Sequence, residues 1–239
     1  MNIKELQKWI NEHNASAKLK VDGVAGALTR SAFIQTFANT NAKAITEEEL
    51  LEIAKELGDT DTRRIKAVAR VESGGSGFFV DGLPKILYER HLFYRTYKKI
   101  ISIATFGLIS SPKSGGYTVD VNENNLNDSW ERLAYAVSYD PDAALQSISI
   151  GKFQVLGKYY DILGYKHPID MLWDASRNEK SHYKFLKDYI LKVAKIKEEY
   201  RKIDSKRDNC RGFARRYNGT SYEKYSYHIK LARAYQMEK

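Results

Sequence analysis

The stretch that most constrains the fold is residues 64–77, which read R-I-K-A-V-A-R-V-E-S-G-G-S-G. Ile65, Val68 and Ala69 recur at helical spacing and Glu72 follows on the same face, so the pattern predicts an amphipathic helix. The Ser-Gly-Gly after it predicts the end of that helix, because glycine tolerates a left-handed cap. The segment therefore predicts a helix packed on a core, with one carboxyl group at its C-terminal end.

At such a position Glu72 is a candidate general acid. Burial and the negative end of the helix dipole both disfavour an ionised carboxylate, so both raise its pKa. A carboxyl group that is still protonated near neutral pH is what general-acid catalysis requires. The alternative is that Glu72 turns to solvent at the helix end and has no chemical role.

The composition is that of a globular protein with a basic C-terminal part. The 239 residues suffice for one large or two small domains, with 43% hydrophobic and 29% charged residues. Residues 177–239 hold 18 Lys and Arg against 8 Asp and Glu, a net charge of +10, so the rest of the chain is near neutral. Such a basic end favours an anionic partner: nucleic acid, a membrane surface or a cell-wall polymer.

The sequence shows no metal motif and no export signal. Cys210 is the only cysteine and the five histidines form no metal-binding pattern, so no metal and no cofactor are expected. The N-terminus lacks an apolar signal region, and no apolar run approaches transmembrane length. We therefore expect a protein made in the cytoplasm without its own signal peptide.

Residues 1–40 predict a small helical domain. A short amphipathic helix at 2–13 is followed by L-K-V-D-G-V-A-G-A-L-T, in which Asp-Gly indicates a turn, and then by a second helix that ends near Phe37. Residues 39–43 are polar and form the best candidate for a linker. The segment resembles the small helical peptidoglycan-binding domain of cell-wall hydrolases, on these matches: Leu6-Gln7, Val21-Asp22-Gly23, Gly26, Thr29, Phe33 and Phe37.

That resemblance implies wall binding, for which we select Asp22, Gly23 and Thr29. Ala27 departs from the family pattern, which usually has proline there. Farther along, a helix is predicted at 91–103, a long loop at 106–127 and a long helix from about 178 to 203.

Three further pieces stand out in the remaining chain. These are Glu72-Ser73 at a helix end, Gly151-x-x-Gln154 opening a helix, and Arg216-Tyr217-Asn218-Gly219 ending one. Their order, with a hairpin-like insert after the glutamate, is similar to the lysozyme superfamily. The motifs V-E-S-G-G-x-G-F, D-G-x-P-x-I-L-Y-E-R-H-x-F-Y, A-A-L-x-S-x-S-x-G-x-F-Q-V-L-G and F-A-R-x-Y-N-G closely resemble the N-acetylmuramidase family of modular phage endolysins over residues 45–239.

The resemblance implies a mainly α protein. Its expected parts are a small wall-binding domain of the three-helix type at 1–40, and a lysozyme-like helical catalytic domain with a short β-hairpin lobe at 45–239. The implied reaction is hydrolysis of the β-1,4 bond between N-acetylmuramic acid and N-acetylglucosamine. Ile150, where the family often has tryptophan, and Lys152, where it prefers an apolar residue, depart from the pattern.

The site residues follow from this reaction. Glu72 matches the family's catalytic glutamate, and a second carboxylate should activate water or stabilise the oxocarbenium-like state. We select Asp81 because a carboxylate on an exposed loop is expected to stay ionised, although it can also be a plain turn residue. Glu89 is the rival, unless it is a buried, paired structural group.

Several side chains could recognise acetamido and hydroxyl groups of the substrate. The candidates for substrate binding are Ser73, Glu89, Ser149, Gln154, Tyr217 and Asn218. Of these, Ser149 is a weaker candidate, and the role of a turn or cap donor is favoured for it.

Three functions are compatible with the sequence. A muramidase endolysin would hydrolyse peptidoglycan, acting on the wall after release across the inner membrane and causing host lysis. A lytic transglycosylase would produce 1,6-anhydro-muramic acid ends, and a wall-binding protein without activity would produce none. The expected partners are peptidoglycan and an anionic outer-membrane surface, with no nucleic acid because no nucleic-acid motif is present; we expect a monomer.

Overall fold

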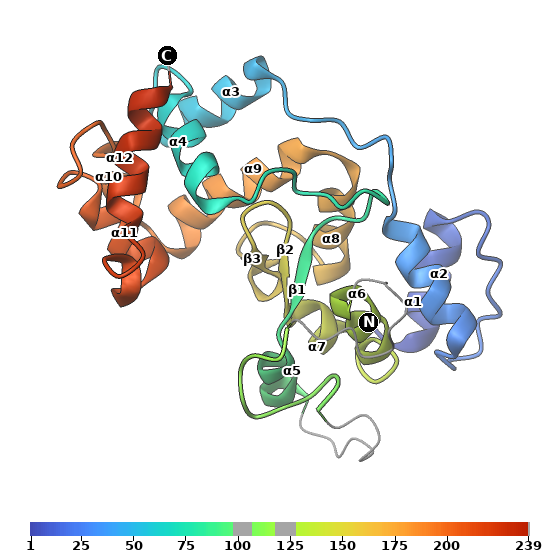
Figure 1. Cartoon of the computed structure of the whole chain (residues 1–239). Coiled ribbons are helices and arrows are strands. Elements are labelled where there is room, and N and C mark those ends of the chain that lie inside the picture. The colour runs from blue at the N-terminus through green and yellow to red at the C-terminus, as the bar shows by residue number, and fades with distance from the viewer. Residues whose placement is uncertain (98–106, 118–127, 239) are drawn as a thin grey trace. The chain divides into compact units, whose positions relative to one another are not determined.

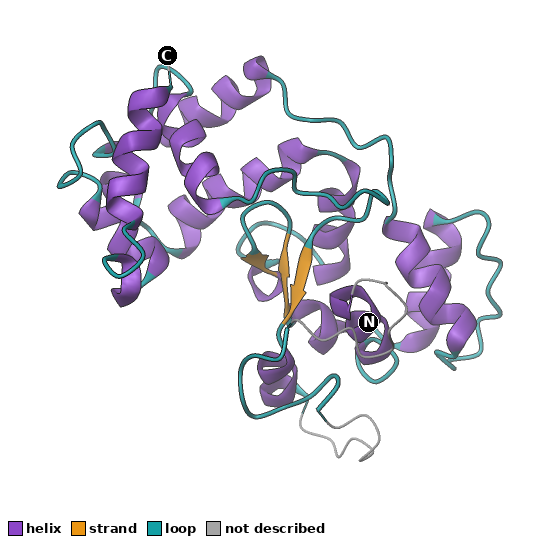
Figure 2. Ribbon diagram, in the orientation of Figure 1, coloured by secondary structure: helices purple, strands orange, loops and turns teal. Residues whose placement is uncertain are grey.

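The computed structural model describes residues 1–97, 107–117 and 128–238, and these are mainly helical with one small antiparallel sheet (Figures 1 and 2). The mainly α class predicted from the sequence is confirmed. Contacts divide the chain into two compact units. The first unit comprises Met1–Asn41 and Phe78–Ser176, and the second comprises Ala42–Gly77 and Arg177–Lys239. These units differ from the two domains predicted from the sequence, residues 1–40 and 45–239, which are distinguished by function. The predicted domains therefore stay a prediction.

The elements of the first unit are α1 (Ile3–His13), α2 (Ala27–Phe37), β1 (Ile86–Tyr88), α5 (Arg90–Thr96), α6 (Asp128–Ala136), α7 (Pro141–Gln146), β2 (Ile148–Ile150), β3 (Val155–Leu156), a 3₁₀ turn (Gly157–Tyr159) and α8 (Pro168–Arg177). Those of the second unit are α3 (Glu47–Leu57), α4 (Arg63–Glu72), α9 (Glu179–Asp188), a π-helical turn (Tyr189–Val193), α10 (Lys197–Arg201), α11 (Arg211–Asn218), a 3₁₀ turn (Thr220–Tyr222) and α12 (Tyr227–Met237). None of the helices described is long and apolar enough to cross a membrane.

Helix α4 forms as its sequence pattern predicts. Ile65 and Val68 are fully buried and Ala69 nearly so, and the helix packs against α12. The helix ends at Ser73, which is extended (φ −120°) and whose hydroxyl donates to the carbonyl of Ala69 at 2.6 Å. The left-handed residue is Gly75 (φ +100°), one position beyond the residue after the C-cap, where a capping glycine usually lies. Glu72 is therefore the last helical residue.

Helices α3 and α9 pack together through opposite charges. The nitrogen Nζ of Lys187 lies 2.7 Å from Glu56 of α3, and Lys180 lies 3.4 Å from both Glu49 and Glu52. Acidic residues outside the basic C-terminal part thus neutralise part of its charge.

The long helix predicted from 178 to 203 is wrong as a continuous helix. After α9 the chain passes through the π-helical turn, and Lys195 adopts a left-handed conformation (φ +52°) before α10 begins. A non-glycine residue in this conformation breaks the helical hydrogen-bond ladder, which an apolar stripe alone does not reveal.

The N-terminal helices contribute to the core of the first unit. Trp9 of α1 and Phe37 of α2 have ring centroids 5.6 Å apart, and Phe37 lies 5.5 Å from Trp130 of α6. Trp9 also meets Trp173 of α8 edge to face at 5.6 Å. Residues 1–41 therefore bury aromatic surface together with residues from the predicted catalytic domain.

The sheet is built from segments far apart in the sequence. Strand β1 pairs antiparallel with β2, and β2 pairs antiparallel with β3. The hairpin is therefore β2–β3, whereas residues 78–84 form a tight loop closed by an isolated bridge between Phe78 and Pro84. The prediction that Gln154 opens a helix is wrong, because Gln154 (φ +52°) lies in the β2–β3 turn.

The predicted helix at 91–103 is shorter, since α5 ends at Thr96. Residues 98–103 lie outside the described residues, as do 106 and 118–127 of the predicted long loop.

Candidate active site

Glu72 of α4 meets Asn218 of α11 inside the second unit. The side-chain nitrogen Nδ2 of Asn218 donates a hydrogen bond to Oε1 of Glu72, at 2.9 Å. The two residues are 146 positions apart in sequence, and both are only partly exposed. The fold therefore joins two of the three sequence motifs, V-E-S-G-G and R-Y-N-G, at one carboxyl group.

The surroundings of Glu72 favour its protonated form. Burial raises the pKa of this carboxyl from 4.5 to about 7, while the hydrogen bond from Asn218 and the positive charge of Lys230 act in the opposite direction. Desolvation is the largest of these effects, and it raises the pKa because it penalises the charged form. The predicted protonation near neutral pH is thus supported, and its main cause is burial.

In the sequence R-Y-N-G, the packing of Tyr217 positions its neighbour Asn218. The ring of Tyr217 stacks on Phe213 at 5.2 Å and meets Tyr189 edge to face at 5.6 Å. Burial raises the pKa of the Tyr217 hydroxyl, and the Glu72 carboxylate adds to that rise. Gly219 (φ +76°) then turns the chain away from the helix. The packed tyrosine and the turn hold Asn218 at the end of α11.

Two residues of α12 that the sequence analysis missed are electrostatically linked to this carboxyl group. Lys230 lowers the pKa of Glu72, and Tyr227 has a raised pKa through burial and through the Glu72 charge. Lys230 additionally lies over the Tyr227 ring at 5.3 Å. No motif marks this pair, because only the packing of α12 on α4 brings it near Glu72.

The other predicted residues have local partners. In the second unit, the Ser73 hydroxyl is bonded to the Ala69 carbonyl at the helix end. In the first unit, Ser149 is almost buried in the middle strand, and Gln154 donates from Nε2 to the Gly151 carbonyl at 2.8 Å.

Asp81 lies exposed in the tight loop at 78–84. Its Oδ1 accepts a hydrogen bond from the backbone N–H of Leu83 at 3.1 Å, as in an Asx turn. The next residue, Gly82, has φ +81°, and an added Cβ there would lie 2.5 Å from the backbone of Asn39. The Asp-Gly turn predicted from sequence is therefore present, and its glycine is required by both conformation and space.

Glu89 is enclosed by side-chain partners. Its Oε2 accepts a hydrogen bond from the Tyr117 hydroxyl at 2.8 Å and lies 3.2 Å from Nδ1 of His91. Its backbone N–H donates to the carbonyl of Ser147. The side chain is 15% exposed. Glu89 thus joins α5, the loop at 107–117 and the end of α7.

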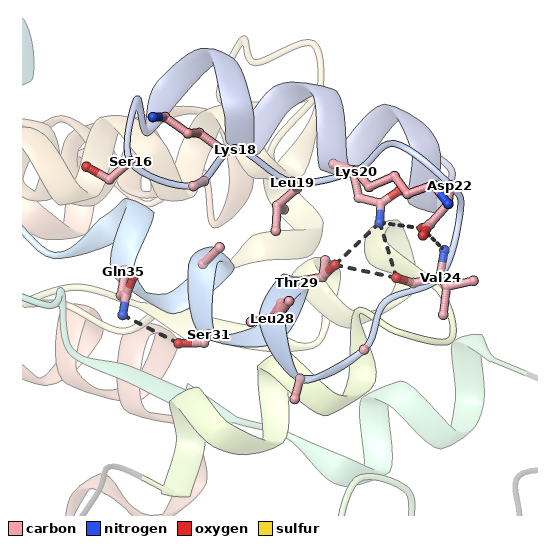
Figure 3. A pocket seen from close by; sticks show the side chains of 15 residues that line it. Ser16, Lys18, Leu19, Lys20, Asp22, Val24, Leu28, Thr29, Ser31 and Gln35 are labelled. Carbon is pink, nitrogen blue, oxygen red and sulfur yellow. Dashed lines mark hydrogen bonds between the residues drawn. The ribbon is translucent and has the colours of Figure 1, made fainter.

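The predicted wall-binding residues are all bonded to Gln7 of α1, and Figure 3 labels two of them, Asp22 and Thr29. The nitrogen Nε2 of Gln7 lies 3.0 Å from Oδ1 of Asp22 and 3.4 Å from Oγ1 of Thr29, and Oε1 of Gln7 accepts the N–H of Gly23 at 2.9 Å. The hydrogen bond from Gln7 is the main cause that lowers the pKa of Asp22, and the backbone N–H of Val24 adds to it. Asp22, Gly23 and Thr29 are therefore held in one network that shapes the loop between α1 and α2.

A family model and a solved structure are similar to this chain. Residues 61–239 match the model of the family described as "Muramidase: N-acetylmuramidase". The crystal structure of the Burkholderia AP3 phage endolysin is similar, with a TM-score of 0.69 and 28% sequence identity, over 98% of this chain and 93% of that chain. Among curated proteins, none matches the chain. Since the family match covers most of the chain, including Glu72 and Asn218, the protein belongs to the N-acetylmuramidase family of peptidoglycan-hydrolysing glycosidases.

Proposed function

We propose that the protein is an endolysin that hydrolyses the β-1,4 bond between N-acetylmuramic acid and N-acetylglucosamine, with Glu72 as the general acid. The observation that carries this proposal is the Glu72 carboxyl, whose burial raises its pKa to about 7. An acid with a pKa of about 7 is protonated in a large fraction of the molecules near neutral pH, and it can still release its proton. The similarity to a phage endolysin supports the role in host lysis.

Asn218 determines how the acid presents its proton. Because Oε1 of Glu72 accepts the amide hydrogen of Asn218, the acidic proton is carried by Oε2. That proton passes to the glycosidic oxygen as its bond to the anomeric carbon breaks, and the leaving sugar departs as a neutral alcohol. Lys230 then stabilises the Glu72 carboxylate that remains.

Asp81 is our proposal for the second carboxylate. Hydrolysis requires a base for the attacking water or a charge that stabilises the oxocarbenium-like state. Asp81 is exposed, and among the described residues only the Leu83 N–H is bonded to it, at Oδ1. The Glu89 carboxylate is engaged by Tyr117 and His91, which supports a structural role there.

The remaining predicted residues have proposed binding roles. Tyr217 and Asn218 adjoin the acid, so they are the first candidates for contact with the sugar at the cleaved bond. Ser73, Ser149 and Gln154 are proposed as weaker contacts, because each is already bonded or buried within the protein.

We further propose that residues 1–40 retain the enzyme on the wall and that the protein acts as a monomer, made in the cytoplasm of the host and released across the inner membrane. Cationic side chains of the second unit would favour an anionic outer-membrane surface. Lys195 and Lys202 are exposed there, and neither forms a salt bridge with a described residue.

The test is mass spectrometry of the fragments released from purified peptidoglycan. Reducing N-acetylmuramic acid ends are the expected product. Reducing N-acetylglucosamine ends would assign cleavage to the other glycosidic bond. Anhydro-muramic ends would show that the substrate's own hydroxyl replaces water, which is the transglycosylase reaction. No release from intact or sonicated walls would leave only wall binding.

A further inference from the structure

The loop between α1 and α2 and the adjoining face of α2 enclose a groove of about 730 Å³ (Figure 3). Loop residues from Ser16 to Val24 line one side, and Leu28, Ser31 and Gln35 of α2 line the other. A volume of this size accommodates a small molecule or a short peptide. The groove belongs to the first unit and to the segment for which we propose wall binding.

The polar groups predicted to contact the wall are not free to bind a ligand in this groove. Asp22, Gly23 and Thr29 are bound to the Gln7 side chain, which is itself 1% exposed. Breaking these hydrogen bonds to bind a ligand would leave a buried amide without partners, which is costly. Recognition therefore falls to other residues of the lining.

The groove lacks the rings that usually hold sugars. None of its lining residues is Phe, Tyr or Trp, although the chain contains 17 tyrosines. A sugar ring exposes a face of C–H groups that packs well on a flat aromatic surface. The lining instead offers small and aliphatic side chains, and two of these are strongly exposed: Leu28 at 82% and Val24 at 67%.

The groove carries two cationic side chains. Lys18 and Lys20 are both exposed on its loop side, and neither forms a salt bridge with any residue that the structure describes. Asp22 partly offsets Lys20, whose charge lowers the Asp22 pKa. Ammonium groups beside aliphatic side chains suit a ligand that combines carboxylates with methyl groups.

We propose that this groove binds the peptide stem of peptidoglycan and does not bind its glycan chain. The stem is a short peptide containing alanine methyl groups and free carboxylates, whereas the glycan backbone is a chain of sugar rings. Lys18 and Lys20 pair with the carboxylates, and Leu28 and Val24 pack on the methyl groups. This inference rests on the proposed wall-binding function and specifies its ligand.

The first experiment maps binding on the full chain carrying Glu72→Gln, so that ligands are not cleaved. Backbone amide shifts are recorded by NMR with two probes, a synthetic L-Ala-γ-D-Glu-diaminopimelyl-D-Ala stem peptide and the peptide-free glycan chitotetraose. We expect the peptide to shift amides between residues 16 and 35, and the glycan to leave them unchanged. Shifts there with chitotetraose alone would overturn the proposal.

The second experiment measures peptide affinity after Lys18→Gln with Lys20→Gln, and separately after Leu28→Ser. We expect each change to weaken binding by about tenfold or more, because charge-assisted hydrogen bonds or apolar contact is lost. The matched control is Lys8→Gln with Lys166→Gln, two exposed lysines of the first unit that do not line the groove. Equal loss in the control would show a general charge effect and overturn the assignment.

Co-sedimentation of the same variants with intact sacculi separates this inference from the function on which it rests. If the Lys18/Lys20 variant loses stem peptide but still sediments normally, the wall-binding role of the groove is wrong. If every variant sediments normally and the groove also does not bind the stem peptide, the wall-binding role and the stem as the ligand are both wrong. Loss of sedimentation with retained peptide affinity would contradict the stem as the ligand while leaving wall binding intact.

Discussion

Glu72 and Glu89 are two partly buried glutamates beside helix ends, and their surroundings differ. Glu72 ends α4 and, among the described residues, accepts a hydrogen bond from Asn218 alone, whereas Glu89 precedes α5 and is engaged by Tyr117 and His91. Desolvation therefore dominates at Glu72 and raises its pKa to about 7. A carboxyl becomes a proton donor when it is buried with few partners, while one that joins several segments is suited to holding them together.

The substitution Glu72→Gln is the strongest test of this comparison, because the largest effect is expected there. The amide keeps the shape and the acceptor oxygen for Asn218 but has no acidic proton. We expect wall-cleaving activity to fall by about 100- to 10,000-fold, the usual contribution of acid–base catalysis. The measurement is the rate of turbidity loss of purified sacculi, with unchanged circular dichroism as the check on folding.

The control for this substitution is Glu198→Gln, an exposed glutamate of α10 for which full activity is expected. If Glu72→Gln retains more than a tenth of the wild-type rate, Glu72 is not the acid.

The next effect compares Asp81→Asn with Glu89→Gln. As the proposed second carboxylate, Asp81 should lose about 100-fold in rate when its charge is removed, at the lower end of acid–base contributions. Glu89→Gln removes the charge that faces His91, so we expect a lower melting temperature. Because the amide keeps a hydrogen-bond acceptor for Tyr117 and Glu89 has no proposed role in the reaction, we expect the rate to fall by less than about tenfold. Rates on sacculi and thermal unfolding are measured on both variants.

If Glu89→Gln lowers the rate more than Asp81→Asn does and leaves the melting temperature unchanged, Glu89 is the second carboxylate.

A smaller effect is expected at Asn218→Ala, which removes the donor to Oε1 of Glu72. That hydrogen bond lowers the Glu72 pKa, so its loss should raise the pKa and move the alkaline limb of the pH–rate profile to higher pH. We expect a fall in kcat of about tenfold, because the proton is no longer confined to one oxygen. Asn218→Asp, which introduces a like charge, should move the limb in the same direction.

A profile that keeps its alkaline limb while kcat falls would mean that Asn218 contacts the substrate and does not tune the acid. Arg215→Ala, an exposed position on the same helix, is the matched control.

The last effect concerns stability. The folded pKa of Glu72 is raised from 4.5 to about 7, so the native state binds a proton that the unfolded state releases within this interval. The free energy of unfolding should therefore fall as pH rises from 4.5 to 7, by up to about 3 kcal/mol, and stay at the lower value above it. Glu72→Gln should flatten this slope, as measured by urea unfolding from pH 4 to 8.

A wild-type slope that survives in Glu72→Gln would show that other groups cause it.

Local patterns in the sequence were sufficient for several elements. The apolar spacing of residues 65–69 predicted α4, and the amphipathic pattern of residues 2–13 predicted α1. Motif resemblance predicted the family, the mainly α class and Glu72 as a candidate. These features depend on neighbours within one or two turns of the chain or on residue identity, so they can be read before the chain is folded.

Other features could not be predicted in this way. The left-handed conformations of Lys195 and Gln154 break the expected helices, and neither residue type predicts such a conformation. The sheet pairs Ile86 with Ile150, a contact that no periodicity in either segment specifies. The shared aromatic cluster of Trp9, Phe37 and Trp130 likewise depends on packing between distant segments.

By itself, the sequence determined that a glutamate ends an amphipathic helix and that a Tyr-Asn-Gly ends another. Only the tertiary structure decided that Asn218 donates to Glu72, that Lys230 lies near enough to act on it, and that Asp22 and Thr29 are bound to Gln7. The physical reason is range: helix propensity and capping act over a few residues, whereas the desolvation that sets a pKa sums over every segment packed around the group.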